Sequence, residues 1–154
     1  MKSTSLLLTG LCLLLTAPWS CAAPRALLQN PPGAPCMAKV QTGAVWSVGD
    51  GTYMGNINVW LMNLGSTDIP TPWEFTITNP NYLGLSSIWN SQLSGMDTST
   101  GTVTGSVHES WEGMKANSGN EVNVGATFHG SSPQNFYPRA IYVDGVQCAI
   151  QQMR

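Results

Sequence analysis

Tryptophan is the residue in this chain whose number and surroundings most need a chemical explanation. Five of the six tryptophans lie beyond residue 40. Trp89 stands in Ser-Ser-Ile-Trp-Asn-Ser and Trp111 in His-Glu-Ser-Trp-Glu-Gly. A buried indole needs apolar neighbours and an acceptor for its N–H, so we expect both of these side chains to be exposed. Trp46 and Trp73 have aliphatic or strand-forming neighbours and are expected in the core.

Exposed tryptophans of this kind can bind sugars. The faces of a pyranose ring are lined by C–H bonds, so an indole can stack on them while Asn and Gln amides hydrogen-bond the equatorial hydroxyls. Such a site needs no charge and no metal. It does need a rigid support, which the face of a β-sheet supplies.

Catalytic chemistry has weaker candidates in the sequence. Glu109 and Glu112 flank Trp111 and have the residue types of a glycosidase pair, but a domain of this size rarely builds the cleft that such a pair needs. His108 and His129 by themselves do not make a metal site. We therefore expect no enzyme activity, no catalytic residue, no metal and no cofactor.

Short runs in which apolar and polar residues alternate are the elements that must position the tryptophans. In the run 53–63, alternation places Ile57, Val59 and Leu61 on one face, and Asn58 and Trp60 on the other. A similar run at 122–129 has an apolar side and leaves His129 facing outward. Further runs cover 73–78, 102–107 and 140–146, with turn residues between them, and no segment keeps a helical apolar period. This pattern predicts an all-β fold, a two-sheet antiparallel β-sandwich.

The N-terminal segment predicts export. A positive start, an apolar run of about ten residues and a small-residue cleavage site make residues 1–22 a signal peptide. The segment 23–35 contains four prolines and is expected to be an extended leader. One domain then covers 36–150, and we expect the protein to be secreted and extracellular.

The cysteines left after cleavage predict one disulfide bond. Cys12 and Cys21 fall within the signal segment, which leaves Cys36 and Cys148. Two cysteines in an oxidising compartment are expected to pair, and this pair would join the first strand to the last.

The charge content of the chain argues against several classes of partner. The chain has 6 basic and 8 acidic residues and no basic cluster. Nucleic acid and anionic membrane surfaces are therefore not expected as partners. A surface of Asn, Ser, Thr, Gly and Gln fits a neutral, hydroxyl-rich ligand, and we expect a monomer.

From Cys36 to Cys148 the chain resembles the family 2 cellulose-binding modules and the related family 49 modules of plant endoglucanases. The matching pieces occur in order: Cys36, Val45-Trp46, Asn58-Val59, 63–66, 69–73, 83–85, Trp89-Asn90, 110–113, 122–130, 143–145 and Cys148. Each piece is short, and the ordered set between two terminal cysteines is what carries the resemblance.

The resemblance implies about nine strands and an outer face with three aligned aromatic residues that stack on cellulose. Trp89 and Trp111 match the second and third aromatic residues, and Asn58 matches a polar residue of the same face. For the first aromatic residue, Tyr53 matches by position and Trp60 competes by alternation. The residues expected to bind carbohydrate are Tyr53, Asn58, Trp60, Trp89, Trp111 and His129.

The function expected from the residues and the resemblance is adsorption to cellulose or a related β-1,4-glucan without catalysis. Xylan and chitin stay open as ligands. The alternative is a secreted structural or interaction protein whose aromatic face binds a protein partner.

Overall fold

The computed structural model describes residues 31–153. The signal peptide expected at 1–22 and the leader residues 23–30 lie outside this range. The end of the leader, 31–35, forms a turn in which the Ala34 N–H donates to the Pro31 carbonyl.

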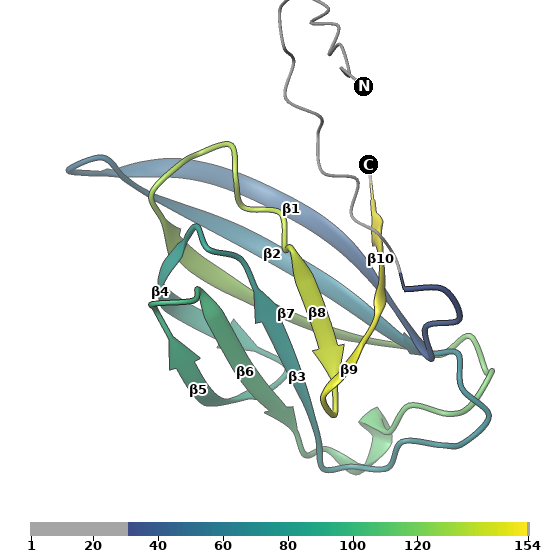
Figure 1. The fold of residues 1–154 in the computed structure, drawn as a ribbon. Coiled ribbons are helices and arrows are strands. Elements are labelled where there is room, and N and C mark those ends of the chain that lie inside the picture. Colours follow the sequence, from purple (N-terminus) through teal and green to yellow (C-terminus); the bar gives the residue numbers. More distant parts are fainter. Residues whose placement is uncertain (1–30, 154) are drawn as a thin grey trace, which may run out of the picture.

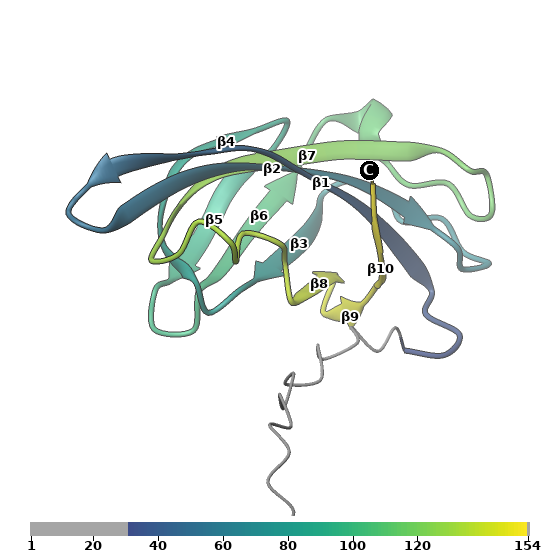
Figure 2. The same cartoon turned by 90° about the horizontal axis from the view of Figure 1, so that it is seen from above.

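Two five-stranded sheets pack face to face, as Figures 1 and 2 show. The first sheet has the order β10-β1-β2-β7-β4, with strands β10 (Ala149–Gln152), β1 (Cys36–Gly49), β2 (Thr52–Asn63), β7 (Glu121–Gly130) and β4 (Tyr82–Trp89). The second has the order β5-β6-β3-β8-β9, with strands β5 (Gln92–Asp97), β6 (Thr102–Val107), β3 (Trp73–Thr78), β8 (Ala140–Val143) and β9 (Val146–Gln147). Within the described range, the one helical element is a three-residue 3-10 turn, η1 (Ser110–Glu112). The expected all-β sandwich is confirmed.

Most strand pairs are antiparallel, and the exception joins the two ends of the domain. β10 runs parallel to β1, with Met37 opposite Ala149. The expected disulfide between Cys36 and Cys148 lies immediately before this pairing, with the two Cα atoms 4.6 Å apart. The bond therefore ties the first strand to the last, as the sequence predicts.

The alternation seen in the sequence decides which side of each strand enters the core. Along β2, Ile57, Val59 and Leu61 are fully buried and the residues between them are only partly covered. The inward set of β7 is likewise buried, and the two sets meet Trp73, Phe75 and the other apolar residues of the second sheet. Period-two patterning thus leaves the opposite face of the first sheet free to carry other chemistry.

The turn expected near the C-terminus also forms. Asp144 and Gly145 both have positive φ, 46° and 77°, and connect β8 to β9. Asp and Gly are residues that tolerate this left-handed conformation, which explains why the chain reverses at this point.

Candidate functional site

The candidate site is the outer face of the β10-β1-β2-β7-β4 sheet. Strand register brings its residues into rows that cross the strands. One row joins Asn58 on β2, Gly125 on β7 and Trp89 on β4. The next row along places Trp60 opposite Asn123. A third row, farther along β2, joins Trp46, Met54 and His129. We use the name aromatic face for the outward residues Trp46, Asn58, Trp60, Trp89 and His129.

Trp89 ends β4 and its indole lies over Gly125. A Cβ atom added to this glycine would fall 2.3 Å from Cε2 and Cζ2 of Trp89 and 2.5 Å from its Nε1. The ring therefore rests directly on the β7 backbone, in space that any other residue would fill. The sequence predicts an exposed Trp89, and the structure gives a half-buried ring held against the outer face.

Trp60 and Asn58 lie where alternation places them, on the outward side of β2. Successive outward residues of a strand are about 7 Å apart and neighbouring strands about 5 Å apart. Trp60 and Trp89 are separated by two strands and one row, so their Cα atoms are about 12 Å apart. Two indoles at this spacing can contact different sugar units of one chain.

An amide relay fixes the polar groups beside Trp60. Asn90 Nδ2 donates to Asn123 Oδ1 over 3.2 Å, and Asn123 Nδ2 donates to the Val59 carbonyl over 3.3 Å. In both Asn90 and Asn123, the side-chain NH₂ group is the donor of the relay. The Asn90 carbonyl oxygen therefore remains as an acceptor next to Trp89.

A second relay crosses the same face on the other side of the Asn58–Gly125–Trp89 row. Ser87 Oγ donates to Thr127 Oγ1 over 3.1 Å, and Thr127 Oγ1 donates to Asn56 Oδ1 over 2.8 Å. These bonds leave Thr127 only 8% exposed although it faces outward. Because its carbonyl is engaged, Asn56 offers its NH₂ group to a ligand.

Trp46 is a correction, because the sequence places it in the core. In the register it lies opposite Met54, which is opposite His129, and all three are on the outer face. Its side chain is 40% exposed. The register of β1 shifts between Thr42 and Val45, so alternation counted from the start of the strand assigns Trp46 to the wrong side.

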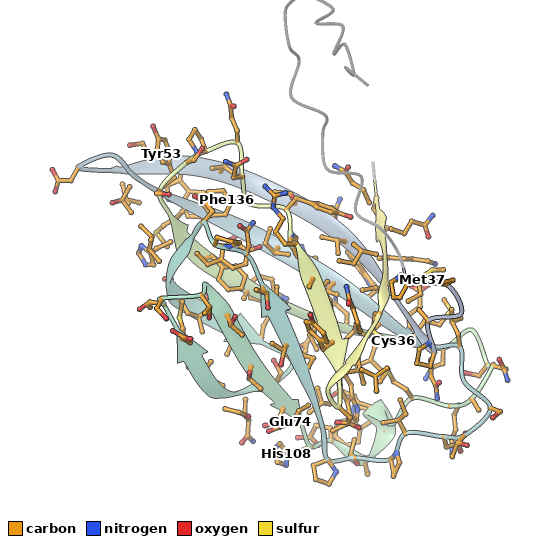
Figure 3. The ribbon with its side chains drawn as sticks, in the orientation of Figure 1. Cys36, Met37, Tyr53, Glu74, His108 and Phe136 are labelled. Carbon is orange, nitrogen blue, oxygen red and sulfur yellow. A yellow bond between two sulfur atoms is a disulfide. The ribbon has the colours of Figure 1, made fainter. Side chains whose placement is uncertain are left out.

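Tyr53 is a second correction, because it was expected on the outer face and the structure turns it toward the core. It has the same parity on β2 as buried Ile57, and its partner Gly130 belongs to the inner side of β7. Tyr53 packs against the core instead of lying on the outer face. It lies at the same end of the sandwich as Phe136, far from His108 (Figure 3). Of the two residues considered for the first stacking position, Trp60 is the one on the outer face.

Trp111 stands beyond the sheet on η1, between β6 and β7, and is 74% exposed, as the sequence predicts. Figure 2 shows this turn at the level of the β10-β1-β2-β7-β4 sheet. An indole with this exposure contributes little to the core. Its neighbours explain how it is nevertheless held in place.

The segment that carries Trp111 is anchored on both sides. Trp73 is 1% exposed, and its Nε1 donates to the Glu112 carbonyl over 2.9 Å. Met114 is fully buried and exchanges two backbone hydrogen bonds with Ile69. The confirmed core position of Trp73 thus has a second consequence, because its indole positions the turn that presents Trp111.

Charged groups lie at the margins of the aromatic face. Lys39 and Glu121 form an ion pair beside Trp60. Lys115 pairs with Asp68 over 2.8 Å, and both line a hollow together with Trp111. The N–H of Ala116 also donates to Asp68, and this bond together with the Lys115 bond holds the pKa of the Asp68 carboxyl below its ordinary value.

Two negative findings apply to residues 31–153. No group of three or more His, Cys, Asp or Glu side chains there is arranged to hold a metal ion. No helix in the same range has the length and apolar character needed to cross a membrane.

Comparisons with known proteins give likenesses of fold. No family model matches the chain, and no curated protein matches it. Among solved structures, it is similar to the family 2 cellulose-binding carbohydrate-binding domain of ScLPMO10C, with 24% identity and a TM-score of 0.42, over 75% of this chain and 96% of that one. It is also similar to part of the family 20 exo-β-N-acetylglucosaminidase of Vibrio harveyi, with 17% identity and a TM-score of 0.41. The likeness covers 75% of this chain and spans 18% of the length of that enzyme.

Proposed function

We propose that this chain is a secreted, monomeric, non-catalytic module that adsorbs to cellulose or a related β-1,4-glucan by stacking its aromatic side chains on the sugar rings. The ordered motifs in the sequence support this function. The arrangement of the outer face supports it independently, from the residues themselves.

The observation that carries the proposal is the placement of Trp60, Trp89 and Trp111 along one side of the molecule, with amides between them. Trp89 is pressed onto the sheet at Gly125 and Trp111 is fixed by the Trp73 hydrogen bond. Rings held in this way lose little conformational freedom on binding, which favours affinity. Trp46 extends the face at the other end of β2, about 20 Å from the Trp60 row.

Adsorption to microcrystalline cellulose tests the proposal. Trp89→Ala and Trp111→Ala are each expected to weaken adsorption by about 30-fold or more, since a few rigid aromatic residues dominate such interfaces. Leu93→Ala is the matched control, because Leu93 is 49% exposed but lies on β5 in the other sheet. Normal adsorption of both tryptophan variants would remove these residues from the site.

The ligand class is decided by the same assay on other polymers. Depletion on cellulose, xylan and chitin is compared at equal surface area, and we expect cellulose to bind most tightly. A protein partner docking on the aromatic face is the rival function, and it predicts no depletion on any of the three.

Salt separates neutral from anionic ligands. A neutral polysaccharide releases no counterions on binding, so adsorption should change by less than about twofold between 20 mM and 1 M NaCl, which are conditions chosen to span about a sevenfold change in Debye length. A steep loss at high salt would indicate an acidic polymer and would contradict stacking as the main force.

A further inference from the structure

We infer that the hollow beside Trp111 is a hydrogen-bonding subsite for one sugar unit of a free, neutral β-linked oligosaccharide chain. This inference rests on the proposed function and extends it, because it gives the module a second class of ligand besides the flat surface of a crystal.

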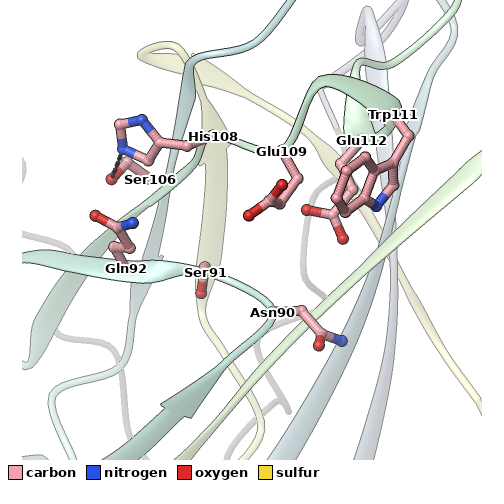
Figure 4. A pocket seen from close by; sticks show the side chains of 8 residues that line it. All are labelled: Asn90, Ser91, Gln92, Ser106, His108, Glu109, Trp111 and Glu112. Atoms are coloured by element: carbon pink, nitrogen blue, oxygen red, sulfur yellow. Dashed lines mark hydrogen bonds between the residues drawn. The ribbon is translucent and has the colours of Figure 1, made fainter.

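The hollow lies where the turn that joins the two sheets meets the end of β6. The turn after β4 supplies Asn90 and Ser91, and the start of β5 supplies Gln92, which is paired with Ser106 of β6. The segment after β6 supplies His108 and Glu109 (Figure 4). Trp111 and Glu112 close one side of it. Its volume is about 410 Å³, which is within the range of small-ligand sites.

The polar groups in the hollow are largely unused by the protein. Within the part of the chain that the structure describes, no hydrogen bond or ion pair engages the side chains of Gln92, Glu109 or Glu112. The Asn90 amide is held through its nitrogen, which leaves its oxygen as an acceptor. His108 Nε2 and Ser106 Oγ bond one another over 2.9 Å and form part of the floor.

These groups define the chemistry of the ligand. Carboxylates are strong acceptors for hydroxyl donors, and two adjacent hydroxyls of a pyranose can both donate to Glu109. The Gln92 amide can both donate and accept. Because Glu109 and Glu112 place two negative charges at the hollow, a sugar with its own carboxylate is repelled. The best fit is therefore a neutral pyranose that stacks on Trp111 and presents its hydroxyls to Glu109 and to the amides of Asn90 and Gln92.

Position relative to the aromatic face explains why a free chain is the ligand. Trp89 and Asn90 are consecutive, so the hollow begins where the row of aromatic side chains reaches the edge of the sheet. The chain passes there from β4 in one sheet to β5 in the other, and Asn90 adopts a positive φ of 57° to make the turn. A flat crystal surface that stacks on Trp89 and Trp111 passes over the hollow without entering it, whereas a single chain stacked on Trp89 can bend into the hollow.

Calorimetry with cellohexaose tests the inference, with adsorption to microcrystalline cellulose measured in parallel. Glu109→Ala and Gln92→Ala are expected to weaken cellohexaose binding about tenfold or more, since each removes hydrogen bonds to the sugar. Their adsorption to cellulose should stay within about twofold of wild type. The isosteric Glu109→Gln variant removes the charge alone, and is expected to increase binding of a β-1,4-linked uronic acid hexamer.

The outcomes separate the two proposals. If the wild-type protein fails to adsorb to cellulose, the proposed function is wrong. If it adsorbs but does not bind cellohexaose, or if both alanine variants bind cellohexaose as tightly as wild type, the subsite is wrong. Unchanged circular dichroism and melting temperature show that the variants are folded, and Glu109→Gln keeps the side-chain shape if Glu109→Ala does not fold.

Discussion

At Gly125, the absence of a side chain decides where the Trp89 ring lies. Several glycines are found on strands of this domain, but their surroundings differ. At Gly125 the added Cβ atom would meet the indole at 2.3 Å, whereas at Gly84, on the same outer face, it would meet the His129 ring at an ordinary 3.5 Å. The two positions therefore separate the effect of a methyl group on the sheet from its effect on the stacking ring.

Gly125→Ala is expected to lift the Trp89 ring off the sheet and weaken adsorption to cellulose about tenfold. The domain should lose only about 1 kcal/mol of stability, because the ring is at the surface and can move away. Gly84→Ala is the control and should adsorb as wild type does. Equal adsorption of both variants, measured by depletion, would show that the position of the Trp89 ring does not matter for binding.

Trp73 connects a core residue to the exposed Trp111. Trp73→Phe keeps an aromatic ring in the core but removes the N–H that bonds the Glu112 carbonyl. We expect a stability loss of about 1 to 3 kcal/mol in urea unfolding, with weaker cellulose adsorption because Trp111 is less well positioned. Trp73→Ala leaves a cavity as well and should cost about 3 to 5 kcal/mol. Adsorption of the Phe variant at wild-type strength would show that η1 is held by other contacts.

Among the elements, η1 and the segment after it depend on contacts with the chain before β3. Asp68 accepts hydrogen bonds from the Ala116 N–H and from Lys115 Nζ, both over 2.8 Å. Asn63 donates to the Met114 carbonyl over 3.1 Å from the end of β2. A segment with no α-helix or strand of its own is thus fixed by neighbours on two sides, which is what a binding residue such as Trp111 requires.

The Asp68 contacts predict a pH dependence. Its pKa is lower in the folded protein than its ordinary value of 3.8, so ionised Asp68 stabilises the fold above about pH 4, and this contribution is lost as the pH falls through the folded pKa. The melting temperature of wild type should therefore exceed that of Asp68→Asn at pH 7, and the difference should shrink between about pH 4 and pH 2.

Calorimetric scans at pH 7, 5, 3 and 2 measure this difference. Lys115→Ala serves as the comparison, because it removes one donor to Asp68 but leaves the Ala116 N–H in place. Its effect at pH 7 should be smaller than that of Asp68→Asn. A difference between wild type and Asp68→Asn that stays constant down to pH 2 would contradict a contribution from the ionised carboxyl.

In the whole molecule, the disulfide and the aromatic face involve different parts of the first sheet. Cys36 and Cys148 are 112 residues apart in sequence and join β1 to the start of β10 at one edge of that sheet. The aromatic face is carried mainly by β2, β7 and β4. Stability against unfolding and the geometry of the face are therefore expected to respond separately to reduction.

Reduction of the disulfide should lower the stability of the domain by about 4 to 5 kcal/mol in the chain-entropy model, because a long loop of the unfolded chain is released. Adsorption to cellulose, measured below the new melting temperature, should be close to that of the oxidised protein. Loss of adsorption in a reduced sample that is still folded would show that the site depends on the terminal strands. The assignment of Trp89 and Trp111 as the main residues of the site would then be wrong.

The sequence alone determines the class of fold and much of the face, because both follow from a local period of two. Ile57, Val59 and Leu61 had to point one way and Asn58 and Trp60 the other, whatever the partners of β2. Composition indicates the disulfide, and polar neighbours indicate that Trp111 is exposed. The placement of Trp73 in the core also follows from its neighbours.

Tertiary structure decides what depends on contacts between strands. A register shift in β1 turns Trp46 outward, which cannot be read from its flanking residues. Tyr53 has the same parity on β2 as Ile57, so the alternation already indicates its inward position, and it was the match by position to the family that pointed the other way. The contact of the Trp89 ring with Gly125 joins residues on different strands. The hollow beside Trp111 exists because the chain crosses from one sheet to the other at Asn90, and the pairing of β5 with β6 brings Gln92 beside Ser106 and close to the segment that carries Glu109.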